Sequence, residues 1–198
     1  MNEPKAYITT YTGGMFDILE PLKSHITIHD IAHSLSMQCR FNGHSRCFYS
    51  VAEHSYQASF LVSGSKFTKL GALMHDAAEA FMSDIPTPVK RLFPEIYKVE
   101  EKIVLAIFEL LELDYEAVDW AKVKEVDRLL LLYEQQQIGT VANKHKAAWG
   151  PWQELYPNQT KIVRGELNSL NMPLPDLEAW EPEHAKHAFI SRFNELTW

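Results

Sequence analysis

Hydrophobic residues recur along most of this chain at intervals of three and four. The pattern runs over residues 67–81, 96–113, 118–138 and 183–196. Such spacing lines one face of a helix with apolar side chains. Two further helices are predicted from their first residues: Thr27 can cap a helix that ends near Met37, and Ser50 opens a capping box with Glu53. The chain is therefore predicted to be mostly α-helical.

The predicted exception is the N-terminus. Residues 7–11 are rich in β-branched and aromatic side chains, and Gly13-Gly14 separates them from Met15-Phe16, which predicts a small β-hairpin. Pro86 and Pro88 should end the central helix, with Thr87-Pro88 as the cap and first position of the next. We expect a single all-α domain: hairpin and lead-in at 1–26, a helical core at 27–140, and an irregular segment with a final helix at 141–198.

Composition narrows the classes of partner. The chain has 198 residues, 46% of them hydrophobic and 23% charged, which is ordinary for a globular protein. A net charge of -7 argues against nucleic-acid and anionic-membrane binding, since both need a basic face. No cleavable signal or long apolar run is evident, and Cys39 and Cys47 are too few for a disulfide framework. These features favour a cytoplasmic protein and leave a homo-oligomer open.

The central helix carries His75, Asp76 and Glu79. On an uninterrupted helix Glu79 lies four residues past His75 and three past Asp76, so all three share one side. An imidazole beside a carboxylate can bind a divalent cation, and a carboxylate one turn on can move protons on a water held by that cation. A His-Asp pair alone is usually an ordinary surface pair, so further ligands are needed.

Two other predicted helices supply candidates. His54 follows the capping box, and Asp127 directly precedes a run of leucines. Taken singly, His54 is more typical of a satisfied core residue, and Asp127 reads equally well as an exposed acid paired with Lys124 or Arg128. Together the residues form an ordered set, H…HD…D, whose mixed nitrogen and oxygen donors suit a six-coordinate ion with room for water and a substrate oxygen.

The loop at 38–46 is the candidate substrate site. It carries Arg40, Phe41 and Arg46, and guanidinium groups beside a ring suit a phosphate and a base. A solvated loop with one buried Phe41 explains the same residues. The preceding helix contains His29 and His33 at a spacing like that of zinc proteases, but with Asp30 in place of Glu; these histidines are predicted to be surface or helix-end residues.

The ordered motifs resemble those of HD-domain phosphohydrolases. Within that superfamily the chain is similar to small bacterial 5'-deoxynucleotidases and phage deoxynucleoside triphosphate hydrolases, including the dATP-specific kind. The matching segments are Val51-Ala52-Glu53-His54-Ser55, His75-Asp76-Ala77-Ala78-Glu79, Asp84-Ile85-Pro86-Thr87-Pro88-Val89-Lys90, and Asp127. The resemblance implies an HD-domain helical bundle that cleaves the 5' phosphoester of a (deoxy)nucleotide, releasing deoxynucleoside plus phosphate or triphosphate.

The resemblance also implies a role for each matching position. The ligands of one divalent ion (Co, Mn, Zn, Fe, Ni or Mg) would be His54, His75, Asp76 and Asp127. Glu79 matches the acid that orients or protonates at the reacting water, and Asp84 matches a second acid near the leaving oxygen.

Substrate contacts are implied less directly. Arg40 falls where the deoxynucleotidases keep a phosphate-binding arginine, and Phe41 stands where some members have tryptophan. His44 or Lys90 would assist Arg40, although Lys90 reads slightly better as a surface residue in the first turn of the next helix.

Rival interpretations differ at a few residues. A (p)ppGpp hydrolase would resemble this chain less, because that group has Glu-Asp where this chain has Glu79-Ala80. Cyclic-dinucleotide phosphodiesterases use extra histidines for a second ion, and His145, His184 and His187 do not fit that pattern. A non-catalytic HD module that senses a nucleotide is the alternative from another class, and the full ligand set argues against it.

Overall fold

A computed structural model of the chain describes residues 6–138, 177 and 179–198. Within these residues the protein is mostly helical with one small antiparallel sheet, as predicted. The irregular course expected from residue 141 onward falls largely outside the described residues. None of the described helices combines the length and apolar character needed to span a membrane.

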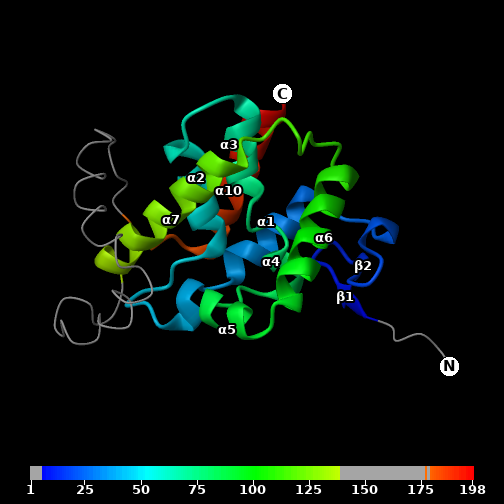
Figure 1. Cartoon of the computed structure of the whole chain (residues 1–198), viewed down its shortest axis with the longest axis horizontal. Helices are drawn as coiled ribbons and strands as arrows, with labels where there is room; N and C mark the ends of the chain where they lie inside the picture. The colour runs from blue at the N-terminus through cyan, green and yellow to red at the C-terminus, as the bar shows by residue number, and fades with distance from the viewer. Residues whose placement is uncertain (1–5, 139–176, 178) are drawn as a thin grey trace.

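The N-terminal hairpin is confirmed. Strand β1 (Tyr7–Thr9) pairs with β2 (Met15–Asp17), with Ile8 opposite Phe16. Gly13 lies in the connecting turn with φ of 88°, a conformation that costs glycine little because it has no Cβ. The Phe16 ring is fully buried and stacks on Phe81 with ring centroids 3.8 Å apart. The hairpin is thereby attached to the helical core (Figure 1).

The remaining secondary-structure elements of the described chain are helices, joined by turns and loops. The two short 3₁₀ turns are η1 (Pro21–Lys23) and η2 (Arg40–Gly43). The α-helices are α1 (Ile28–Met37), α2 (Val51–Leu61), α3 (Lys66–Met74), α4 (Glu79–Met82), α5 (Thr87–Leu92), α6 (Glu95–Leu110), α7 (Trp120–Gln137) and α10 (Pro182–Thr197).

The first residues of α1 and α2 illustrate how well local signals fix a helix start. Thr27 and Asp30 form the complete capping box of α1, each side chain bonding the other's backbone N–H. At α2 only one of the two predicted capping-box bonds is present. The Ser50 hydroxyl accepts from Glu53 N–H, but the buried Glu53 carboxylate accepts from the backbone N–H of Trp180 at 3.2 Å. Tertiary contact with the segment before α10 takes the place of the local bond.

Helix α10 lies against α1, α2 and α3, and α7 packs against α2 and α3 (Figure 1). Gly71 on α3 allows a close approach to the segment before α7, because a Cβ at this position would lie 2.3 Å from Cγ1 of Val118. Burial of apolar surface in this packing is the main stabilising contribution. The resulting core contains buried side chains of α1, α2, α3, α6, α7 and α10.

The prediction of one continuous helix through residue 81 is wrong. Helix α3 ends at Met74, residues 75–78 form turns, and α4 begins at Glu79. Backbone bonds here run to the third residue back, as in Ala77 N–H to Met74 O and Ala80 N–H to Ala77 O. His75 and Asp76 contact His54, whereas the Glu79 carboxylate contacts Lys90. Helix α5 also starts one residue early: Pro86 is its N-cap, and Thr87 provides no capping bond.

Candidate metal centre

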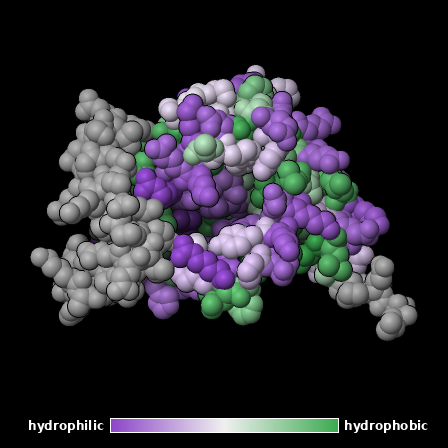
Figure 2. Space-filling view, viewed as in Figure 1, coloured by the Kyte–Doolittle hydropathy of each residue, from purple (hydrophilic) through white to green (hydrophobic). Residues whose placement is uncertain are grey.

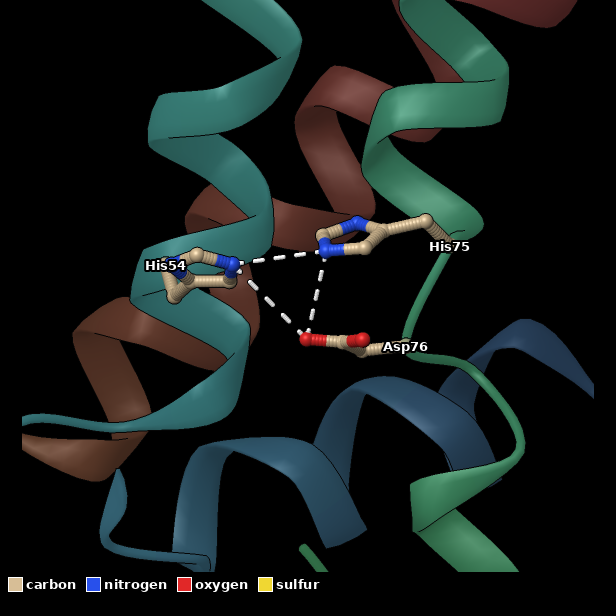
Figure 3. Close-up of side chains that lie close together, drawn as sticks. All are labelled: His54, His75 and Asp76. Carbon is tan, nitrogen blue, oxygen red and sulfur yellow. Dashed lines mark hydrogen bonds and ion pairs between the residues drawn. The ribbon is translucent and has the colours of Figure 1, made fainter. Parts of the chain in front are cut away.

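His54 is held rigidly on the first turn of α2. Its side chain is fully buried, and Nδ1 lies 2.6 Å from Oε1 of Glu134 on α7. Because an ionised carboxylate only accepts hydrogen bonds, Nδ1 carries the proton of this contact. The other ring nitrogen, Nε2, points toward His75 and Asp76 (Figure 3).

His75 and Asp76 come from the turn that follows α3. His75 Nδ1 lies 2.7 Å from the carbonyl oxygen of Ala72, so this ring also donates from Nδ1. Its Nε2 lies 3.3 Å from Nε2 of His54 and 3.3 Å from Oδ2 of Asp76. The three side chains face a common point from two elements (Figure 3).

The spacing of these donor atoms suits a cation. One donor atom from each of His54, His75 and Asp76 lies within 4.8 Å of the other two, and the group could hold a metal ion. Two ligands about 2.1 Å from one ion are about 3.0 Å apart at a right angle and about 3.4 Å apart at the tetrahedral angle. Nε2 of His75 lies 3.3 Å from both of its partners, and His54 Nε2 lies 3.7 Å from Asp76 Oδ2, which is close to this range.

Asp127 stands beside this group, on the middle of α7. Its Oδ1 lies 3.0 Å from Nε2 of His54 and 3.6 Å from Nε2 of His75. The Asp127 side chain is 39% exposed, whereas those of Asp76 and His54 are 18% and 0% exposed. The cluster is therefore closed at His54 and open to solvent at Asp127, where water or a ligand can enter.

The two imidazoles create an electrostatic problem that a cation solves. With Nδ1 protonated in both neutral rings, the two Nε2 lone pairs face each other and the carboxylates of Asp76 and Asp127. Such an arrangement is repulsive unless a positive charge lies among the four groups. Either a proton on an imidazole or a metal ion supplies that charge.

The pKa values follow the same charges. Burial and Arg40 lower the pKa of His54, but the Glu134 and Asp127 carboxylates raise it to about 9. Burial also lowers the pKa of His75, and Asp76 and Asp127 raise it above its ordinary value. Burial raises the pKa of Asp127, but the two imidazoles hold it well below its usual range. The site therefore favours positive charge at its centre.

Glu134 is a site residue that sequence reasoning missed. It is fully buried on α7, and its Oε2 accepts from Nε of Arg40 at 3.2 Å while Oε1 contacts His54. Burial raises its pKa, but Arg40 and His54 lower it below the ordinary value. A signal was present, since Glu134 lies seven residues, about two turns, after Asp127 and shares its face of the helix.

Arg40 lies at the cluster, and the alternative of a solvated loop is wrong for this residue. Its side chain is buried, with Nη1 3.5 Å from Oδ2 of Asp76. Burial lowers its pKa, but the Glu134 and Asp76 carboxylates raise it, so the guanidinium is charged. Phe41 is half-buried, with its ring centroid 5.5 Å from the Arg40 guanidinium carbon, and has φ of 59°. His44 is exposed.

Glu79 belongs to a second group of charges on α4, α5 and α6. It is buried, its Oε1 lies 3.5 Å from Nζ of Lys90, and its buried Oε2 has no hydrogen-bond partner among the described residues. Lys90 also binds the Glu100 carboxylate and is only 11% exposed. The interpretation of Lys90 as a surface residue is wrong. Glu100, on a helix that showed no sign of chemistry, was missed.

The acids of this second group have raised pKa values. Burial raises the pKa of Glu79 well above its ordinary value, and the Asp76 and Asp84 carboxylates raise it further. Burial also raises the pKa of Asp84, opposed by Arg40. Gln38, a third residue missed from sequence, links the segments: its amide donates to Glu79 O at 3.0 Å and accepts from Asp84 N–H at 3.1 Å.

The other candidate histidines lie away from this centre. His29 is exposed, as predicted. His33 is half-buried and stacks on Tyr11 with ring centroids 3.7 Å apart, so a surface position is confirmed only in part for this residue. Asp30 serves α1 as a cap. On α10, His184 contacts the Trp180 ring and His187 pairs with Glu183, neither of which brings it to the cluster. His145 lies outside the described residues.

The surface near these elements is concave. Figure 2 shows a hollow bordered by hydrophilic residues, in the area where Figure 1 shows α2, α7 and α5. A hydrophilic rim suits a polar or charged ligand better than an apolar one.

Comparison with known proteins finds a relative that matches nearly the whole chain. The chain is 37% identical over 192 residues to the "Uncharacterized protein YfdR" of Escherichia coli (strain K12), covering 97% of this chain and 96% of that protein. An uncharacterized protein of Rhodobacter capsulatus is 34% identical over 112 residues, which is 52% of this chain and 57% of that protein. No protein-family model matches the chain.

Proposed function

The chain belongs to the family of the E. coli protein YfdR, and we propose that it is a metal-dependent phosphohydrolase of the HD-domain type acting on (deoxy)nucleotides. It would cleave the 5' phosphoester and release a deoxynucleoside with phosphate or triphosphate. Two free cysteines, Cys39 and Cys47, fit the cytoplasmic location that we propose for it.

One observation carries the proposal: two imidazole Nε2 atoms and two carboxylates meet, and both Nδ1 atoms are already committed to acceptors. His54 donates to Glu134 and His75 to the Ala72 carbonyl. Histidines that bind metals characteristically donate their second N–H in this way. We assign His54, His75, Asp76 and Asp127 as the ligands. The mixed N/O set suits Mn, Fe, Co, Ni, Zn or Mg rather than a thiolate-seeking ion.

A divalent ion in this position would polarise a phosphoryl oxygen and lower the pKa of a water. Side chains of the protein would bind the phosphate and admit the substrate. Arg40, charged and close to Asp76, would bind a phosphate oxygen. The exposed edge at Asp127 would admit the substrate.

Glu79 and Asp84 are proposed to move protons. Glu79 is buried and Asp84 is half-buried, and both carboxyls have raised pKa values. Each carboxyl therefore stays protonated to a higher pH than an ordinary one. A protonated acid can supply the proton that a leaving 5' oxygen needs. Oε2 of Glu79, which has no hydrogen-bond partner within the described part of the chain, could take part in such an exchange.

The test is hydrolysis by purified full-length protein. Metal is removed by chelation, then Mn, Co, Mg or Zn is restored, and release of phosphate and triphosphate from a panel of nucleotides is measured. We expect metal-dependent release that Glu79→Ala reduces strongly. Mass spectrometry of the products from dAMP and dATP would distinguish phosphate from triphosphate release. Nucleotide binding without turnover in every metal would contradict the proposal and favour a regulatory module.

A further inference from the structure

We propose that Glu134 is a positioning residue that couples cation binding to anion binding at this centre. The inference rests on the proposed function, because it assigns to Glu134 a role toward the ion and the phosphate. Glu134 touches neither of them; it acts through His54 and Arg40.

The two carboxylate oxygens of Glu134 bind different residues. Oε1 accepts from His54 Nδ1 at 2.6 Å, and Oε2 accepts from Arg40 Nε at 3.2 Å. The carboxylate is fully buried, so water does not compete for either contact. One rigid group therefore fixes the orientation of a proposed metal ligand and of a proposed phosphate-binding residue.

The contact with His54 determines which nitrogen is available to the ion. As long as Nδ1–H donates to Oε1, the lone pair of Nε2 faces His75 and Asp127, 3.3 Å and 3.0 Å away. Without Glu134, the ring would lose the acceptor that fixes this tautomer. Outer contacts of this type typically change metal affinity by about 10- to 100-fold.

The contact with Arg40 matters once the ion is bound. Nη1 of Arg40 and Nε2 of His75 both approach Oδ2 of Asp76, at 3.5 Å and 3.3 Å. An ion bound by Asp76 competes with Arg40 for this oxygen. Glu134 then remains as the anchor of the guanidinium, whose Nη groups are free to bind an anion beside the ion. Cation and anion binding should therefore strengthen each other, since such coupling is reciprocal.

The test compares Glu134→Gln with Glu125→Gln, a matched change at an exposed position of α7. The glutamine is nearly isosteric, but its NH₂ group must face one of the two donors, His54 Nδ1–H or Arg40 Nε–H. On metal-free, full-length protein, the Mn²⁺ dissociation constant is measured by calorimetry, with and without inorganic phosphate. Circular dichroism checks that each variant is folded.

For the natural chain we expect phosphate to tighten Mn²⁺ binding several-fold. Glu134→Gln should weaken Mn²⁺ binding about 10- to 100-fold and remove the phosphate effect, while Glu125→Gln changes neither. Equal Mn²⁺ affinity and an unchanged phosphate effect in Glu134→Gln would overturn the inference. Failure of the natural chain to bind Mn²⁺ would overturn the proposed function as well. Binding without hydrolysis would overturn only the function.

A second measurement covers the case in which Glu134→Gln does not fold. In the natural chain labelled with ¹⁵N-histidine, nitrogen spectra distinguish a protonated Nδ1 from a protonated Nε2. On addition of Zn²⁺ we expect the His54 Nε2 signal to shift while Nδ1 keeps its proton. Binding of Zn²⁺ at Nδ1 of His54 would overturn the role given to Glu134.

Discussion

Two charged groups border the candidate site, and they differ in how completely their polar atoms are satisfied. Around His54, the ring nitrogens contact Glu134, His75 and Asp127 at 2.6 to 3.3 Å. Around Glu79, Oε1 makes a long 3.5 Å contact with Nζ of Lys90, and Oε2 is buried without a hydrogen-bond partner among the described residues.

The supporting elements differ in the same way. His54 lies on a helix that packs against α3, α7 and α10. Glu79 begins the four-residue helix α4, and its partner Lys90 comes from α5, which has no buried residues. A cation needs ligands fixed in advance, whereas a proton-transfer group benefits from an atom left available for the substrate. The contrast is consistent with one region for binding an ion and another for moving protons.

The largest effect is expected from removing a proposed metal ligand from the group around His54. Asp127→Ala leaves two imidazoles and one carboxylate, and it opens no cavity because the side chain is 39% exposed. Metal affinity and hydrolysis should fall by more than about 100-fold, the range reached by outer contacts alone. Calorimetry and the phosphate-release assay measure both. Glu125→Ala, exposed on the same helix, should retain both.

The next largest effect is expected in the group around Glu79. Glu79→Gln removes the proposed proton-transfer group and leaves the four proposed ligands in place. We expect kcat to fall about 10²- to 10⁴-fold, the usual contribution of general acid–base catalysis, with Mn²⁺ affinity unchanged. A parallel loss of metal binding would show that the two regions are one unit and would end the distinction drawn above.

A stability measurement sharpens the contrast further. Lys90→Met leaves the Glu79 and Glu100 carboxylates without their shared cation, and the side chains are 4% and 20% exposed. Removing one partner of a buried ion pair typically lowers the free energy of unfolding by about 3 to 5 kcal/mol. We expect about 3 kcal/mol here, because Glu100 is partly exposed. Urea unfolding should show the loss. Lys98→Met, in an exposed pair with Glu95, should change the unfolding free energy by less than about 1 kcal/mol.

Asp30 provides the smallest expected effect and a reference acid without proposed chemistry. Its carboxylate accepts from the backbone N–H groups of Thr12 and Thr27, both at 2.8 Å. Burial raises its pKa, but these bonds lower it below the ordinary 3.8. The ionised form therefore stabilises the fold above the unfolded-state pKa, and this contribution is lost as pH falls through the lower folded-state pKa.

Asp30→Asn is expected to cost about 1 kcal/mol, in the range of a helix cap. The difference in urea midpoint between the variant and the natural chain should be full near pH 6 and shrink toward pH 3. A difference that grows on acidification would contradict the assigned pKa direction. Hydrolysis and Mn²⁺ binding should be unaffected at neutral pH.

Local signals predicted the elements well because they act over a few residues. The hairpin around Gly13, the cap at Thr27 and the starts of α2 and α10 are set by turn chemistry, capping and spacing. The same signals failed at residues 75–78. Apolar spacing continues through the break, since Ala77, Ala78 and Phe81 are all buried. The pattern therefore gave no sign that the winding changes.

The sequence by itself determined the helical class and the hairpin and indicated four candidate ligands, because the apolar period, the caps and an ordered H…HD…D set are readable along the chain. Only the tertiary structure decided that Asp127 contacts His54, that Lys90 pairs with Glu79, and that Glu134 joins Arg40 to His54. These contacts join residues between 11 and 94 positions apart. They depend on how the helices pack, and packing is fixed by the burial of many side chains together rather than by any short segment.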